Sequence, residues 1–254
     1  MGNLCDFMTS NNISMAAVCD PHRPRGRMPR LPEGFSSVAC EVDPAAAFIM
    51  RRPPYDVCPL MVTKWVVAIF CQSRAFDFVL IISAYGPRHK PMQHTHGLVE
   101  EVVERSSSEN VVVAGDFNAK HRAWGPRAGD ERAARVMELA ATAGLAVIND
   151  PLSPPTYETA YAASWIDVTL ATPAVVAAGC TWEVREDVTF SEHKYVTVRI
   201  GGREAAPRKR LMRYAQAYRV SLSRRRIRAG GRPCRDHRRR STRNASVGVR
   251  SRCV

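Results

Sequence analysis

Residues 1–200 are predicted to adopt an α/β fold, because short apolar runs of strand length alternate with amphipathic patterns of helix length. Hydrophobic residues make up 45% of the 254-residue chain, which is enough to bury a sizeable core. Beyond residue 200 the apolar periodicity ends. We therefore expect one globular domain at 1–200 and a separate segment at 201–254.

The first half of the domain predicts two helices and several short strands. One helix is expected at residues 4–12, and a second around residues 98–103, where leucine and valine recur at helical spacing opposite glutamates. The strands are expected at residues 13–19, 35–40, 45–50, 65–72 and 76–83, the last two joined by a tight turn at residues 73–74.

The second half continues the alternation. Asp130 is the expected N-cap of a helix that ends at Gly144 and has Met137 in its apolar stripe. Pro173 and Gly179 bound a short helix, and residues 151–163 form a polar loop. The strands are expected at residues 111–114, 145–149, 164–171, 182–186 and 195–200.

Charge separates the two segments. Residues 1–200 hold 19 Lys and Arg against 22 Asp and Glu, a balance of −3, whereas residues 201–254 hold 18 against 2, a balance of +16. Arginine clusters among Ser, Gly and Ala cannot bury a core, so this basic tail is expected to be disordered when free. It favours a nucleic-acid partner, with DNA contacted by residues such as Arg208, Lys209 and Arg210.

Several classes of protein are excluded by the sequence. No run of about 18 apolar residues predicts a membrane span, and the N-terminus lacks a signal-peptide pattern. The eight cysteines contain no Cys-x-x-Cys pair, which favours reduced, buried thiols over a disulfide framework or a zinc site. We expect an intracellular, nuclear protein.

The stretch from Val111 to Trp124 contains the first candidate site. Gly115 permits a sharp turn at the end of a buried strand, and Asp116 and Asn118 follow two residues apart. Side chains at i and i+2 of a strand project to the same side, so an acid and an amide would point together, which suits phosphodiester chemistry. A strand followed by an Asx turn fits the same residues equally well.

A second acid, Asp167, lies in the apolar strand predicted at 164–171. Because burying an acid is costly unless it is paired, hydrogen-bonded or metal-bound, Asp167 needs a partner. A third motif, Ser191-Glu192-His193, comes just before the last predicted strand.

These three motifs resemble those of the endonuclease/exonuclease/phosphatase superfamily, which includes deoxyribonuclease I and the apurinic endonucleases. Over about residues 4–200 the chain resembles in particular the endonuclease domain of insect non-LTR retrotransposons. This closer resemblance rests on two motifs, Gly-Asp-Phe-Asn-Ala-Lys-His at 115–121 and Ser-Trp-Ile-Asp-Val-Thr-Leu-Ala at 164–171. The resemblance implies a four-layer α/β sandwich, in which two packed mixed β-sheets are flanked by helices, as in deoxyribonuclease I.

The resemblance also implies metal-dependent nicking of DNA, with Mg²⁺ or Mn²⁺ as cofactor. In retrotransposons such a nick exposes a 3′ hydroxyl that primes reverse transcription. Asp116 would orient or deprotonate the attacking water, Asn118 would hold a phosphate oxygen, and Asp167 would support the site.

The third motif supplies the phosphate-binding histidine. His193 would bind the scissile phosphate or transfer a proton, and Glu192 would orient it. Asp20 and Glu192 are the expected metal ligands, although Asp20 also fits a turn ahead of a proline. Tyr85, at a strand end, either meets the scissile phosphate or caps the strand edge.

The chain departs from the family pattern at three places. Asp20 stands where the family has Glu, and Glu192 where it has Asp. An earlier strand that carries an active-site Asn precedes the point where this chain begins, and its loss would leave an unpaired sheet edge. Two alternatives therefore stay open: a catalytically decayed domain that binds nucleic acid, and another phosphodiesterase or phosphatase of the superfamily.

Overall fold

The computed structural model describes residues 1–51, 56–72 and 78–201. The turn predicted at residues 73–74 and the basic segment, including Arg208, Lys209 and Arg210, lie outside the described residues. No helix in the described ranges has the length and apolar character needed to cross a membrane. Within these ranges Cys5, Cys19, Cys40, Cys71 and Cys180 are free thiols, and of these Cys5 and Cys71 are buried.

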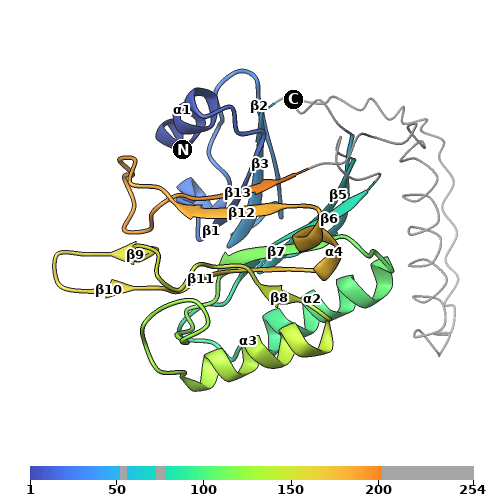
Figure 1. The fold of residues 1–254 in the computed structure, drawn as a ribbon. Coiled ribbons are helices and arrows are strands. Elements are labelled where there is room, and N and C mark those ends of the chain that lie inside the picture. Colours follow the sequence, from blue (N-terminus) through green and yellow to red (C-terminus); the bar gives the residue numbers. More distant parts are fainter. Residues whose placement is uncertain (52–55, 73–77, 202–254) are drawn as a thin grey trace, which may run out of the picture. The chain divides into compact units, whose positions relative to one another are not determined.

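A six-stranded sheet forms one layer of the domain (Figure 1). The sheet is mixed: β6 (Val79–Tyr85) and β7 (Val111–Asp116) are parallel neighbours, and all its other neighbouring strands are antiparallel. Its strands, in spatial order, are β4 (Val57–Val62), β5 (Val66–Cys71), β6 (Val79–Tyr85), β7 (Val111–Asp116), β11 (Asp167–Ala171) and β8 (Ala146–Val147).

A second layer of antiparallel strands packs on one face of the six-stranded sheet. It consists of a three-stranded sheet, in which β3 lies between β1 and β2, and a separate pair, β12 and β13. Strand β1 contacts β6 and β7, and Trp182 of β12 donates a hydrogen bond to Thr169 of β11. The bounds are β1 (Met15–Cys19), β2 (Phe35–Ala39), β3 (Ala46–Arg51), β12 (Cys180–Val184) and β13 (Val196–Ile200).

Helices cover the outer faces of both layers, which confirms the predicted four-layer sandwich of two packed sheets. Helix α1 packs on β3, and helices α2 and α3 pack on the six-stranded sheet (Figure 1). A short helix, α4, follows β11 and contacts β12. The bounds are α1 (Gly2–Ser10), α2 (Gln93–Ser106), α3 (Glu131–Thr142) and α4 (Pro173–Ala177).

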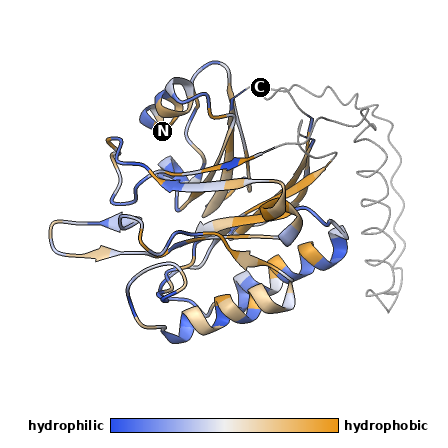
Figure 2. Ribbon diagram, in the orientation of Figure 1, coloured by the Kyte–Doolittle hydropathy of each residue, from blue (hydrophilic) through white to orange (hydrophobic). Residues whose placement is uncertain are grey.

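The two long helices are amphipathic, with their apolar side toward the sheet (Figure 2). Asp130 is the N-cap of α3, because its carboxylate accepts the backbone N–H of Ala133 at 2.7 Å. Val136 and Leu139 are fully buried, whereas Met137 is 37% exposed. The prediction that Met137 lies in the core is therefore wrong, because one residue after Val136 the helix has turned by about 100° away from the apolar stripe.

Gly115 lies inside β7 and is needed for close packing rather than for a turn. A Cβ atom at this position would lie 1.8 Å from the carbonyl oxygen of Ala84 on β6. The backbones of these two parallel strands therefore approach more closely than any side chain permits. Cys19 of β1 also reaches this point, where its thiol accepts the backbone N–H of Asp116 at 3.3 Å.

Gly115→Ala is expected to lower the free energy of unfolding by about 1–3 kcal/mol or more, because the clash is with backbone and cannot be relieved by a side-chain rotation. Urea denaturation of both proteins measures the difference. Gly97→Ala is the matched control, because a Cβ there meets nothing within 4 Å, and a similar loss in both variants would contradict the packing role of Gly115.

Some elements were missed by the sequence prediction. Strand β4 contains Pro59, which a strand interior normally excludes, but β4 is an edge strand and its register shifts between Pro59 and Met61. The polar loop predicted at 151–163 ends in a short hairpin, formed by β9 (Tyr157–Glu158) and β10 (Ala163–Ser164). This hairpin and the loop before β13 bring the next group of residues together.

Candidate active site

Asp116 and Asp167 lie side by side where β7 ends and β11 begins. They are directly paired in the antiparallel ladder between these strands. Asp116 is only 5% exposed, and both residues line a cavity between the two sheet layers. The ladder therefore explains why two acids that are far apart in the sequence, one buried and one partly buried, lie side by side.

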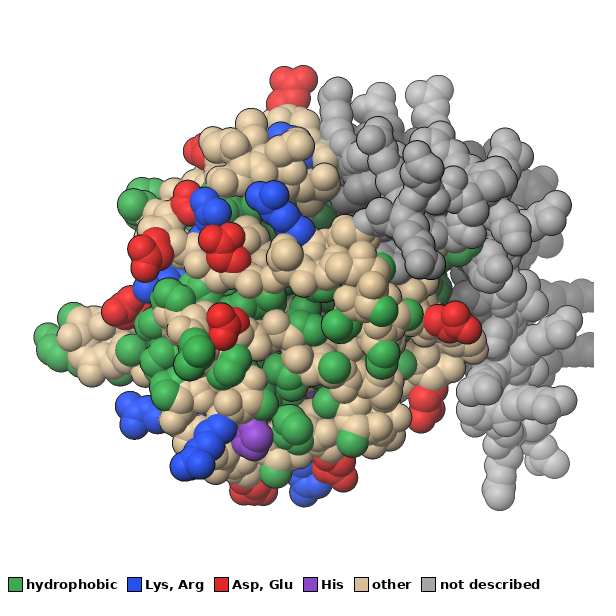
Figure 3. Space-filling model, in the orientation of Figure 1, with side chains coloured by type: hydrophobic (Ala, Val, Ile, Leu, Met, Phe, Trp, Pro, Cys, Tyr) green, Lys and Arg blue, Asp and Glu red, His purple; other side chains and the backbone are tan. Residues whose placement is uncertain are grey.

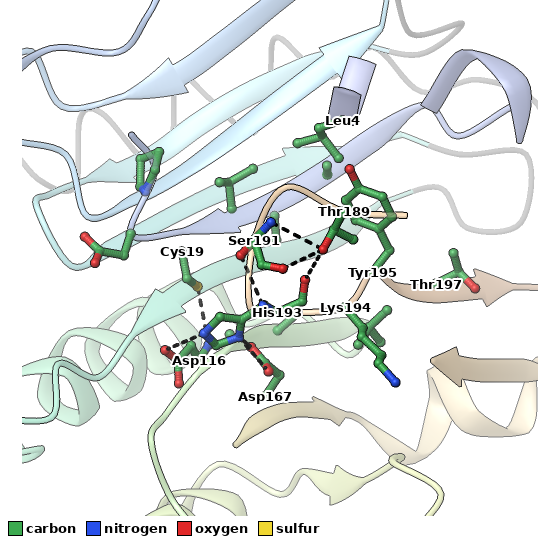
Figure 4. A pocket seen from close by; sticks show the side chains of 18 of the residues that line it. Leu4, Cys19, Asp116, Asp167, Thr189, Ser191, His193, Lys194, Tyr195 and Thr197 are labelled. Carbon is green, nitrogen blue, oxygen red and sulfur yellow. Dashed lines mark hydrogen bonds and ion pairs between the residues drawn. The ribbon is translucent and has the colours of Figure 1, made fainter. Parts of the chain in front are cut away.

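His193 lies between the two acids (Figure 4). Its Nδ1 is 3.1 and 3.0 Å from the two carboxylate oxygens of Asp167, and its Nε2 is 3.9 Å from an oxygen of Asp116. The bond to Asp167 places a hydrogen on Nδ1 and directs Nε2 toward Asp116 and the cavity. We refer to Asp116, His193 and Asp167 as the Asp-His-Asp group.

Two members of the Asp-His-Asp group, Asp116 and His193, have raised pKa values. Burial, and then the negative charge of Asp167, raise the pKa of Asp116 to about 7. Burial alone would lower the pKa of His193, but the hydrogen bond and charge of Asp167, with the charge of Asp116, outweigh it and raise that pKa. A carboxylate able to accept a proton thus faces an imidazole that holds one.

Glu192 does not orient His193, which corrects the role predicted for it. The exposed carboxylate of Glu192 instead accepts a hydrogen bond from the hydroxyl of Tyr157 at 2.8 Å. The side chains of Glu192 and His193 have different partners, Tyr157 and Asp167, so they diverge. Asp167 takes the place beside the imidazole, which also supplies the partner that a buried acid requires.

Asp116 forms the Asx turn that was one of the two readings of this motif, and Asn118 is the donor in that turn. The φ of Asn118, +49°, places it in the left-handed region, and its backbone N–H donates to Asp116 at 2.9 Å. The side-chain amide donates to the other oxygen of Asp116 at 3.0 Å and to the carbonyl of Gly86 at 3.2 Å. Both amide hydrogens are therefore engaged, so Asn118 positions Asp116 in this structure.

Arg88 is a basic group at the mouth of the same cavity that the sequence prediction missed. Its Nε donates to the side-chain oxygen of Asn118 at 3.4 Å, and the residue is exposed. A guanidinium in this place has further donors free to meet an anion. In the sequence Arg88 is one of many arginines in polar segments, so no local signal distinguished it.

Other residues missed from the sequence hold the Asp-His-Asp group in place. Asn149 donates to the carbonyl of Asp167 at 2.9 Å and accepts the backbone N–H of Thr169 at 2.7 Å, which fixes the start of β11. Tyr157 forms a β-bridge with His193 and packs edge-on against its ring at 5.0 Å. These contacts join segments distant in the chain, so neither residue carried a local sequence signal.

Tyr85 and Asp20 line the same cavity as the Asp-His-Asp group. Tyr85 is the parallel-register partner of Asp116, and burial, followed by the charge of Asp20, raises the pKa of its phenol to about 12. The hydroxyl therefore keeps its proton at neutral pH. Asp20 follows β1 with a φ of +44°, and its exposed carboxylate forms an ion pair with Arg23 at 2.7 Å.

The described side chains do not form a ready metal site. Within the described ranges no group of three or more His, Cys, Asp or Glu residues is placed to hold a metal ion. Of the two predicted ligands, Asp20 is paired with Arg23, and Glu192 is bonded to Tyr157. As they stand, these residues do not fit the implied ion, and Mg²⁺ dependence stays a prediction.

A family model described as an endonuclease-reverse transcriptase matches residues 79–197. This segment contains all three members of the Asp-His-Asp group in the order that the motifs predicted. Over residues 79–197 the chain matches the endonuclease/exonuclease/phosphatase superfamily. The description of the matching model supports a nuclease domain of that superfamily. No curated protein sequence matches the chain.

Three solved structures with a similar fold are described as nucleases. The chain is similar to the endonuclease domain of TRAS1, a telomere-specific non-LTR retrotransposon, at 23% identity and a TM-score of 0.67, over 78% of this chain and 90% of that chain. It is also similar to the AP endonuclease LMAP from Leishmania major, at 11% identity and a TM-score of 0.60, over 78% and 81%. The 3′-5′ exonuclease NExo from Neisseria meningitidis has 14% identity and a TM-score of 0.56, over 78% and 93%.

Proposed function

We propose that the domain is a DNA endonuclease that hydrolyses a phosphodiester bond with the Asp-His-Asp group. The observation that carries the proposal is His193, held by Asp167 on one nitrogen and facing buried Asp116 with the other. The 3.9 Å gap between Nε2 and the Asp116 oxygen is too long for a hydrogen bond. It leaves both groups available to a water molecule and a phosphate that enter the cavity.

Each residue has a part that follows from its contacts. Asp116 accepts a proton from the water that attacks phosphorus, because its pKa of about 7 makes it a competent base at neutral pH. His193, in its protonated form, donates from Nε2 to a phosphate oxygen as negative charge develops there. Tyr85 keeps its hydroxyl hydrogen and donates a hydrogen bond to the same phosphate. The P–O3′ bond breaks, and O3′ takes a proton from solvent water to leave a 3′ hydroxyl.

Two features support DNA as the substrate. One is the positive charge of the basic tail, and the other is the cavity at the Asp-His-Asp group. On the face shown in Figure 3, the acidic and basic side chains of the described residues are scattered, not gathered into a basic area. The basic tail, with 18 Lys and Arg against 2 acids, would supply salt-dependent affinity for any DNA sequence. The likeness to a retrotransposon endonuclease supports priming of reverse transcription as the purpose of the nick.

Conversion of supercoiled plasmid to nicked circle tests this proposal. We expect nicking with Mg²⁺ and its loss in EDTA, as the family resemblance implies. Release of phosphate from an inositol phosphate, without plasmid nicking, would instead support the phosphatase alternative.

One observation favours the alternative of a decayed domain: Asp20 is neutralised by Arg23, and no metal cluster is formed by the described residues. The double variant Asp20→Glu with Glu192→Asp restores the family residues. A gain of several orders of magnitude in nicking would identify a weakened enzyme. Inactivity of both proteins, when each is shown to be folded, would favour a decayed domain.

A further inference from the structure

Arg132 lies in the first turn of α3, where a positive charge is unfavourable because the helix N-terminus carries a partial positive charge of its own. Local preference therefore does not explain an arginine at this position, and the residue is partly buried. Side chains of a helix lean toward its N-terminus, so the guanidinium of Arg132 reaches the segments that follow β6 and β7. Its role follows from the contacts it makes there.

Each nitrogen of this guanidinium donates to a backbone carbonyl. Nε and Nη2 donate to the carbonyl of Phe117 at 3.2 and 3.0 Å. Nη2 also donates to the carbonyl of Gly86 at 2.7 Å, and Nη1 donates to that of Lys90 at 3.2 Å. A planar guanidinium has five hydrogens in a fixed arrangement and can hold several acceptors at once. Arg132 thus joins the loop at residues 86–90 to the turn after β7.

The same two segments carry residues of the candidate site. Phe117 lies between Asp116 and Asn118. The carbonyl of Gly86 also accepts the side-chain amide of Asn118 at 3.2 Å, and the backbone N–H of Gly86 donates to the carbonyl of Asp116 at 2.7 Å. This close approach requires glycine, because a Cβ at position 86 would lie 3.1 Å from Nη2 of Arg132 and 3.2 Å from the carbonyl oxygen of Phe117. Arg132 therefore bonds to the carbonyls that flank the turn at Asp116.

We propose that Arg132 is a positioning residue for phosphodiester hydrolysis, which holds the turn at Asp116 and Asn118 against the loop that carries Arg88. These three residues line the cavity and Arg132 does not, so Arg132 acts through them and not on the substrate. A displacement of about 1 Å at a reacting group can cost about 10²-fold in rate. The proposal deepens the proposed function and rests on it for the kinetic tests below, but not for the exchange test.

Steady-state nicking of plasmid by Arg132→Met tests the proposal, with each rate expressed per folded molecule from circular dichroism. We expect kcat to fall by about 10- to 10²-fold and KM to change by less than about threefold, because groups at the cavity are displaced and none is removed. Arg135→Met is the matched control. Arg135 lies on the same helix, and its guanidinium donates to the exposed carboxylate of Glu138 at 2.9 Å, so kcat is expected to stay near the native value.

Two further variants separate positioning from charge and from a general loss of stability. Arg132→Lys keeps the charge but not the planar set of donors, so it is expected to recover only part of the lost kcat. In a double-mutant cycle with Asn118→Ala, the double variant is expected to be about as slow as the slower single variant, because both changes disturb one turn. Losses that multiply, or full recovery by Arg132→Lys, would overturn the proposal.

Amide hydrogen exchange, followed by NMR, tests the positioning role without catalysis. The backbone N–H groups of Asn118 and Gly86 both donate to Asp116, at 2.9 and 2.7 Å. Their exchange is expected to be at least about tenfold faster in Arg132→Met than in the native protein, and unchanged in Arg135→Met. If the native protein does not nick DNA, the proposed function fails and the exchange rates still decide the role of Arg132. Unchanged exchange, or native kcat in folded Arg132→Met, would overturn the proposal.

Discussion

Asp167→Asn is expected to lower the rate of plasmid nicking by about 10²- to 10⁴-fold, the usual contribution of a positioned acid-base pair. The Asp167 carboxylate accepts the Nδ1 hydrogen of His193 at 3.0 Å and raises its pKa. An amide in its place carries no charge and can present its N–H₂ group to Nδ1, so the imidazole would no longer be held in its positively charged form. The rate is measured on supercoiled plasmid at fixed pH.

Glu192→Gln is the matched control for this prediction. Glu192 is exposed and bonded to Tyr157, so its loss is expected to lower the rate by less than about fivefold. The reverse ranking, with Glu192→Gln the more damaging of the two, would return the orienting role to Glu192. It would show that Asp167 supports only the fold.

Asp116→Asn is expected to abolish most activity, by about 10²- to 10⁴-fold, because an amide cannot accept a proton from water. In the native protein the rate should rise as pH passes about 7, where Asp116 loses its proton. It should fall at higher pH, where His193 loses its own. Initial rates from pH 5 to 9 measure both limbs. If the residual rate of the variant still rises near pH 7, a group other than Asp116 is responsible for the rise.

Stability provides an independent test of the same residue. The pKa of Asp116 is raised from 3.8 to about 7 by folding, so the folded state binds more protons than the unfolded state between these values. The free energy of unfolding therefore decreases as pH rises through this window, and the loss is complete above it. At pH 8 Asp116→Asn is expected to be more stable than the native protein by about 1–3 kcal/mol, and at pH 3 this gain should vanish. Greater stability of the native protein at pH 8 would contradict a buried, strained carboxylate.

Elements with a strong local pattern were predictable from the sequence. The valines of β7 and the apolar stripe of α3, with its cap at Asp130, depend only on neighbours within a few residues. Strand β4 was not predictable, because Pro59 is tolerated only through its edge position and the register shift beside it. The β9–β10 hairpin is two residues long on each side, which is too short for any periodicity to appear.

The sequence predicted which residues belong to the candidate site better than it predicted the contacts among them. The cost of burying Asp167 correctly indicated a partner, but which residue it was depends on the antiparallel pairing of β7 with β11 and on the loop before β13. Glu192 was assigned the orienting role because it adjoins His193 in the sequence, whereas its side chain points to Tyr157. Arg88 and Asn149 act through tertiary hydrogen bonds, which leave no trace in local sequence.

The most direct test of the central claim compares plasmid nicking by the chain and by His193→Ala, with Mg²⁺ or with EDTA. His94→Ala, which changes an exposed histidine on α2 outside the cavity, is the control. We expect Mg²⁺-dependent nicking that is lost in His193→Ala, by at least about 10²-fold, and retained in His94→Ala. Equal nicking by His193→Ala, or none by folded native protein, would contradict a phosphodiester hydrolase that acts through the Asp-His-Asp group.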